Sequence, residues 1–250
     1  MVAHAWFPGR YIGGAALIVA PIAWCIGLLL RSVVHRTGFT AAELEHFDRQ
    51  PFAAPGQLAA YAENPALVTA GYAFFLAGAI LLWPAFSTVA TVVAARSPRL
   101  ATLGGALLVL SLFARVYTAG VEQTAFELVE LQGLDAATRA VSDGYVDISY
   151  GPWRIPVIAS ACGYLGMLLL VIGAFRSGTL GLGRSAVLLW AGTMWGGVLK
   201  EATLFDVLAA TALGTALVPL GVRVLRGRVP ELLPAETTPA PPRRPRWFSW

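Results

Sequence analysis

Apolar residues run along this chain in six long stretches, separated by short polar or glycine- and proline-containing segments. A helix needs about 20 residues to cross the hydrocarbon core of a bilayer, so stretches of this length predict membrane-spanning helices. The six stretches are Tyr11–Leu30, Ala66–Val89, Leu100–Gly120, Ile155–Phe175, Ser185–Leu199 and Ala202–Val222. The sequence therefore predicts an all-α integral membrane helical bundle with six transmembrane helices, forming one membrane domain over residues 1–228.

The fifth stretch, Ser185–Leu199, is shorter than a typical span. Arg184 and Lys200 flank it, and long cationic side chains that reach the headgroups can extend a short span. The alternative joins the last two stretches into one span with a re-entrant piece, which would move the C-terminal end to the opposite side. Six spans with both termini inside place eleven basic residues inside and six outside. Because cytoplasmic segments carry the excess of Lys and Arg, we expect both termini in the cytoplasm.

Two long outer segments follow from this topology, at about 31–64 and 121–154. Thr40 and Glu43 have the spacing of a capping box, so the first segment should contain a short helix. In the second segment, the third span should continue as a helix up to Gly133, which should serve as its C-cap. A further short helix should follow it. The outer side is therefore expected to carry two structured loops.

Small residues recur within the spans and predict where helices approach one another closely. Gly104 and Gly105 lie in the third span, Gly163 and Gly166 in the fourth, and Gly192 begins a Gly-x-x-x-Gly pattern in the fifth. Such patterns let backbones come close, and we expect them to serve packing within the chain rather than a dimer interface. The remaining tail, residues 229–250, is rich in proline and arginine and is expected to be a disordered cytoplasmic segment.

Composition supports a membrane protein and excludes most soluble classes. Hydrophobic residues make up 57% of the 250 residues and charged residues 13%, whereas soluble domains average about 25% charged residues. The net charge of +4 comes from short loops and the tail, so it indicates topology rather than nucleic-acid binding. Abundant Ala, Gly, Pro and Arg suggest a GC-rich bacterial genome, which gives the bacterial cytoplasmic membrane as the expected location. No cofactor or metal site is expected.

One group of polar residues in the outer half of the spans is the candidate functional site. Charges inside a span are costly and often functional. Arg115 in the third span and Asp206 in the sixth lie at matching depths, so we expect them to pair, directly or through water. Five further polar residues are placed in or just above the same layer: Tyr72, Tyr117, Glu122, Lys200 and Glu201. This concentration of polar groups predicts a cavity in the outer half.

Known catalytic motifs are lacking in the sequence, which contains no nucleophile elbow, phosphate-binding loop or His-Glu-x-x-His pattern. The first hypothesis is therefore an accessory, scaffold or sensor protein without its own catalysis, with the outer loops contacting a partner protein. The second is a small-solute transporter or permease that uses the Arg115–Asp206 pair. The third is a membrane-embedded enzyme acting on a lipid or apolar metabolite. The lipid bilayer is the expected environment in all three, and a homo-oligomer is left open.

Overall fold

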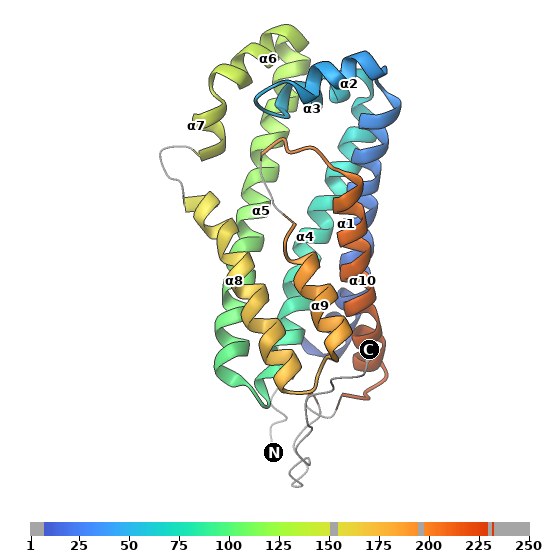
Figure 1. Ribbon diagram of the computed structural model, residues 1–250, viewed down its shortest axis with the longest axis vertical. Helices are drawn as coiled ribbons and strands as arrows, with labels where there is room; N and C mark the ends of the chain where they lie inside the picture. The colour runs from blue at the N-terminus through green and yellow to red at the C-terminus, as the bar shows by residue number, and fades with distance from the viewer. Residues whose placement is uncertain (1–7, 151–154, 195–197, 230–231, 233–250) are drawn as a thin grey trace.

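The computed structural model describes residues 8–150, 155–194, 198–229 and 232, and these form helices connected by short segments, without strands. Five helices are long and apolar enough to cross a membrane. They are α1 (Gly9–Thr37), α4 (Pro65–Ala94), α5 (Pro98–Gln132), α8 (Ile155–Arg176) and α10 (Leu204–Leu225). They run roughly along one common direction and form an upright bundle (Figure 1). The chain is therefore an all-helical, multi-pass membrane protein.

The bundle is held by three principal helix contacts: α1 against α4, α1 against α10, and α5 against α8. Glycines allow the closest of these approaches. A Cβ atom on Gly166 of α8 would lie 2.7 Å from the Leu108 nitrogen of α5, and one on Gly104 would lie 2.8 Å from the Leu170 nitrogen. The expectation that the glycines of these two helices serve packing within the chain is confirmed. Below them, large aliphatic side chains fill the core of the bundle.

Four short helices form a cap over one end of the bundle (Figure 1). They are α2 (Ala41–Asp48), α3 (Ala54–Glu63), α6 (Leu134–Asp143) and α7 (Tyr145–Tyr150). This cap has its own hydrophobic cluster, in which the rings of Tyr61 on α3 and Phe126 on α5 stack at 4.7 Å. The buried Leu199, which precedes α10, belongs to the same cluster. The cap is therefore packed onto the outermost part of the bundle.

The capping predictions are confirmed. The Thr40 side chain accepts from the Glu43 N–H, and the Glu43 carboxylate accepts from the Thr40 N–H. These hydrogen bonds lower the pKa of Glu43, because they favour its ionised form. Gly133 ends α5 with a φ of 82°, a conformation that glycine adopts without a steric penalty. Helix α3 was not predicted; Pro55 occupies its first turn, where the missing N–H of a proline costs no helical hydrogen bond.

The prediction of six spanning helices requires a correction at the fifth stretch. Helix α9 (Leu182–Ala191) contains 10 residues, which corresponds to about 15 Å, half the thickness of the hydrocarbon core. It stops at the C-cap Gly192, and the described residues from 198 to Thr203 are not helical. Glycine weakens a helix by about 1 kcal/mol relative to alanine. Gly192 therefore ends the helix. It also packs closely against α8, as predicted, because a Cβ atom on it would overlap the side chain of Met167. Gly196 lies outside the described residues.

The start of α1 and the end of α10 lie together, at the end of the bundle opposite the cap. The Arg10 guanidinium at the start of α1 donates to the Leu225 carbonyl oxygen at the end of α10, with an Nε–O distance of 3.0 Å. A single span merged from the last two stretches would have placed these helix ends on opposite sides. The chain instead rises through α9 toward the middle of the bundle and returns through α10 from beneath the cap (Figure 1). Of the predicted disordered tail, only Val229 and Leu232 lie within the described residues.

Candidate functional site

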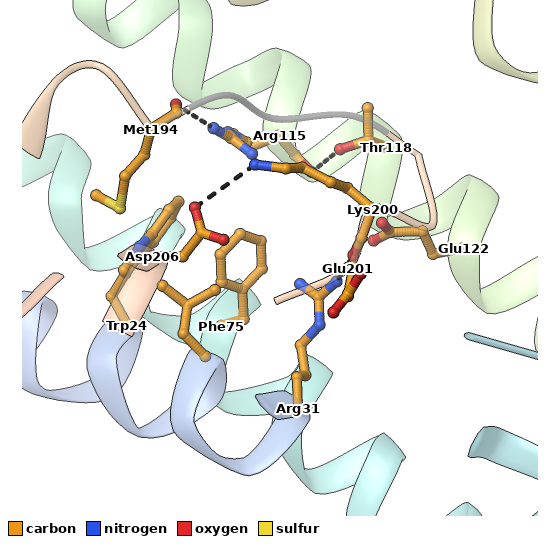
Figure 2. A pocket seen from close by; sticks show the side chains of 11 residues that line it. Trp24, Arg31, Phe75, Arg115, Thr118, Glu122, Met194, Lys200, Glu201 and Asp206 are labelled. Atoms are coloured by element: carbon orange, nitrogen blue, oxygen red, sulfur yellow. Dashed lines mark hydrogen bonds and ion pairs between the residues drawn. The ribbon is translucent and has the colours of Figure 1, made fainter. Parts of the chain in front are cut away.

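A polar cavity lies below the cap, between α1, α4, α5, α10 and the non-helical segment that joins α9 to α10. Figure 2 shows side chains from all of these elements converging on one space. Three cations and three anions line it, namely Arg31, Arg115, Lys200, Glu122, Glu201 and Asp206. Equal numbers of opposite charges lower the electrostatic cost of placing them together inside an apolar bundle.

The non-helical segment between α9 and α10, which we call the interrupted crossing, is held at its described residues by side chains from the surrounding helices. Arg115 Nη2 donates to the Met194 carbonyl oxygen at 3.3 Å, and Arg31 Nη2 donates to the Lys200 carbonyl oxygen. Glu122 Oε1 accepts from the Leu199 N–H at 2.9 Å. Non-helical backbone at membrane depth must find such partners within the protein or in a water-filled cavity. The charged residues therefore satisfy backbone groups that a complete fifth helix would have satisfied by itself.

Leu199 marks the most constrained point of this segment. Its φ of 50° lies in the left-handed region, which is uncommon for a residue with a side chain. Its side chain is nevertheless fully buried in the cluster of the cap. Such conformations persist where the surrounding structure fixes them, and they are concentrated at functional sites. The Glu122 hydrogen bond and the cap packing together fix Leu199.

Asp206 lies in the first turn of α10, and it lines the cavity. Its carboxylate accepts from the Thr203 N–H at 2.9 Å and from the Thr203 hydroxyl at 2.7 Å, and the Asp206 N–H donates back to that hydroxyl. This is a capping box at a helix N-terminus, where a negative charge is also favoured by the helix dipole. Lys200 Nζ lies 3.5 Å from the same carboxylate. Asp206 is therefore held both as a cap and as half of an ion pair.

The predicted direct pair between Arg115 and Asp206 does not form in the described structure. Both residues line the same cavity, but Asp206 contacts Lys200 instead (Figure 2), and it also bonds to Thr203. The Arg115 guanidinium lies above the ring of Trp24, with its carbon 5.6 Å from the ring centre. Lys200 takes this place because the non-helical segment brings it into the cavity. A water-mediated link between Arg115 and Asp206 stays a prediction.

The other predicted residues divide into two groups. Glu122, Lys200 and Glu201 line the cavity. Tyr72 borders it, because the Arg31 guanidinium stacks 4.1 Å from the centre of its ring. Tyr117 is 49% exposed on the outer face of α5 and does not line the cavity.

Arg31 and Trp24 are site residues that the sequence pattern did not identify. Arg31 was assigned to the outer loop because it follows the apolar run of the first span. Helix α1 continues to Thr37, however, and Arg31 is only 8% exposed within it. The consecutive apolar residues after it, Val33 and Val34, were the available signal that the helix continues.

A second cavity lies farther from the cap along α5. Arg115 and Glu122 line the first cavity, whereas Ser111 and Leu108 line the second. Their volumes are about 30 Å³ and 80 Å³, and one water molecule needs roughly 10–15 Å³ on this scale. Three residues line both cavities and separate them: Trp24, Arg115 and Met194. The arrangement is thus two small spaces in series, divided by a constriction beside the interrupted crossing.

Comparisons with models of protein families, with curated protein sequences and with solved structures find no match to this chain.

Proposed function

We propose that this protein is a permease that binds a small polar solute and moves it across a bacterial cytoplasmic membrane. The observation that carries the proposal is the pair of cavities in series along α5, separated at Trp24, Arg115 and Met194. A scaffold needs no such spaces, and the accessory hypothesis predicts a completely filled outer half. The water-sized volumes favour a solute of a few heavy atoms.

The interrupted crossing supports the same proposal. Many transporters bind solutes where a transmembrane helix is broken, because half-helix ends and unwound backbone present polar groups at membrane depth. Here α9 ends at Ala191, beside the second cavity, and α10 begins at Leu204, beside the first. Arg115 contacts the segment between them through Met194. A solute passing the constriction would therefore contact a segment that can change its backbone contacts.

The three acidic residues of the cavity favour a solute pathway over catalysis. Glu122 accepts from the Leu199 N–H, and Asp206 accepts from Thr203 and Lys200. Glu201 Oε1 lies 3.3 Å from His35 Nε2. A general acid or base must be within reach of a reacting group, and each of these carboxylates is engaged in holding the protein. The enzyme hypothesis consequently has less support than transport.

The test is solute flux into vesicles that contain the full-length protein. Stopped-flow light scattering would follow the entry of formate, methylammonium and urea, three solutes of similar size that differ in charge. We expect at least one to enter faster than into protein-free vesicles. Rates equal to those of protein-free vesicles for all three would overturn the proposal and favour an accessory role.

A matched pair of variants ties flux to the second cavity. Ser160 lines that cavity, whereas Ile158, two residues earlier on α8, is 64% exposed on the lipid-facing surface. Ser160→Phe should fill the cavity and reduce flux, and Ile158→Phe should leave flux unchanged. Thermal unfolding of both variants in detergent would show that the protein is folded. Equal flux in a folded Ser160→Phe variant and in the wild type would contradict a pathway through this cavity.

A further inference from the structure

We propose that the cavity below the cap binds a small monocarboxylate anion, of one or two carbon atoms, between Arg31 and Arg115. The inference deepens the proposed function by naming its solute class, and it rests on that function only where transport is concerned. Binding itself follows from how the charges of the cavity are partnered.

Carboxylates of the cavity are already supplied with donors. Glu122 is bonded to the Leu199 N–H, Asp206 to Thr203 and Lys200, and Glu201 to His35. A cationic ligand would have to share each carboxylate with the donor that already holds it. The three carboxylates therefore attract a cation less strongly than carboxylates without bound donors would.

The two arginines are different. Neither Arg31 nor Arg115 has a carboxylate within 4.0 Å among the described residues; the hydrogen bonds that they make there go to the carbonyl oxygens of Lys200 and Met194. Both guanidinium groups also lie near the ring of Phe75, at 5.3 Å and 5.9 Å from its centre. Buried cations are normally paired with an anion. The cavity consequently presents two guanidinium groups that share its carboxylates at longer range but contact none of them directly within the described residues.

Two buried hydrogen-bond donors that line the same cavity lack an acceptor within the described part of the chain. They are Arg31 Nε and Trp24 Nε1, on side chains that are 8% and 4% exposed in total. A buried donor without a partner is costly, and a ligand that brings acceptor oxygens would remove that cost. The planar, forked guanidinium group matches the two oxygens of a carboxylate. These two donors therefore favour an anionic ligand that carries acceptor oxygens.

The size of the space limits this anion. A volume of about 30 Å³ holds about two water molecules, which is comparable to formate or acetate. A dicarboxylate such as succinate would require the cavity to expand. Arg115 also lines the second cavity, so an anion held by Arg115 lies at the constriction between the two spaces.

Isothermal titration calorimetry on the full-length protein in lipid nanodiscs would test this inference with sodium formate, sodium acetate, sodium succinate, sodium chloride and methylammonium. We expect formate or acetate to bind more tightly than the other three. Arg31→Gln and Arg115→Gln should each weaken binding by roughly 10- to 100-fold, since each removes a hydrogen bond from a charged group. Arg36→Gln, an exposed arginine five residues after Arg31 on α1, is the matched control and should bind normally.

Two further variants separate binding from folding. Trp24→Phe keeps the ring and removes the Nε1 donor, so it should weaken formate binding by a few-fold. Arg31→Lys keeps the charge and loses the fork, so it should give an affinity between those of the wild type and Arg31→Gln. Thermal unfolding would identify any variant that has lost its structure. Normal binding by both folded Arg→Gln variants would overturn the assignment, and so would chloride binding as tightly as formate.

Flux measurements distinguish the two proposals. Formate binding without flux of any of the three solutes would refute transport and leave the anion site standing. Flux of methylammonium or urea without carboxylate binding would refute the anion site and leave the pathway standing.

Discussion

Glu122 offers the most direct test of how the interrupted crossing is held. This residue is 3% exposed on α5, and its Oε1 accepts from the Leu199 N–H at 2.9 Å. Glu122→Ala removes the acceptor, while the cap keeps the Leu199 N–H away from water. Leu199 also has a φ of 50°, which the remaining contacts must then maintain. We therefore expect the segment before α10 to open more often in this variant.

The magnitude follows from the cost of a buried donor without a partner, about 1–3 kcal/mol. Since each 1.4 kcal/mol corresponds to a tenfold change in an equilibrium constant, the open population should rise by about 5- to 150-fold. Hydrogen exchange through local opening reports this population directly. Amides of residues 198–203 should therefore exchange faster by that factor, and those in the middle of α4 should be unaffected.

Hydrogen–deuterium exchange with mass spectrometry, on protein in nanodiscs, would make this measurement. Glu122→Gln keeps an acceptor oxygen and should have a smaller effect. Glu127→Ala removes an exposed carboxylate from the same helix and should leave exchange unchanged. If Glu122→Ala and the wild type exchange equally over residues 198–203, Glu122 does not fix this segment, and the reasoning is wrong.

Three other predictions follow from the fold. Gly166→Val should lower the unfolding temperature in detergent, because a Cβ atom there would lie 2.7 Å from a backbone nitrogen of α5; Gly120→Ala, with nothing within 4 Å of the added atom, should not. The hydrogen bond from Tyr61 to Glu130 raises the pKa of Tyr61 to about 12. Its stabilisation should therefore be fully present below pH 10, the pKa of a free tyrosine, and should decline as pH rises toward 12. Thermal unfolding should show Tyr61→Phe to be less stable at pH 8 by about 1 kcal/mol, with the difference shrinking above pH 10. Finally, Asp48→Cys, in a chain whose native cysteines are replaced by serine, should react with a membrane-impermeant maleimide in intact cells; labelling only after permeabilisation would reverse the proposed topology.

The long helices were predictable because the properties that specify them are local. Length and hydropathy locate α1, α4, α5, α8 and α10 without knowledge of their neighbours. The same is true of the two caps, since the spacing of Thr40 and Glu43 and the glycine at position 133 act within one turn of helix. These features depend only on residues that are close together in the sequence, so they can be predicted without knowing the fold.

The fifth stretch could not be predicted in the same way, because its apolar composition fits either a helix or a buried extended segment. What decides between them is whether the surrounding helices supply partners for the backbone. Arg115, Arg31 and Glu122 supply them from two different helices. Gly192 was the local signal, but a glycine in an apolar run also suits helix packing. Tertiary contacts therefore decide whether this stretch is helical or extended.

The Arg115–Asp206 prediction failed for the same reason. Matching depths were derived from two complete helices, and that geometry left Lys200 at the edge of the membrane. The non-helical segment carries Lys200 inward instead, to 3.5 Å from Asp206. Both residues do line one cavity. The partners of Arg115 and Asp206 depend on the path of the non-helical segment, and hydropathy does not predict that path.

A coupling between ligand and backbone follows from the dual role of the arginines. Arg31 and Arg115 hold the interrupted crossing through the carbonyl oxygens of Lys200 and Met194, and they are also the groups proposed to bind the anion. An anion that takes up guanidinium hydrogens competes with those carbonyls. Ligand occupancy and the position of the segment are then linked, because a ligand shifts a conformational equilibrium by its difference in affinity for the two states. In the reverse direction, a change that shifts the segment between its two states should also change the apparent anion affinity. Glu122→Ala and Glu122→Gln remove the same negative charge from the cavity, but only the first also removes the acceptor that holds the segment. Their formate affinities should therefore differ, whereas a binding site independent of the segment would give the two variants equal affinities.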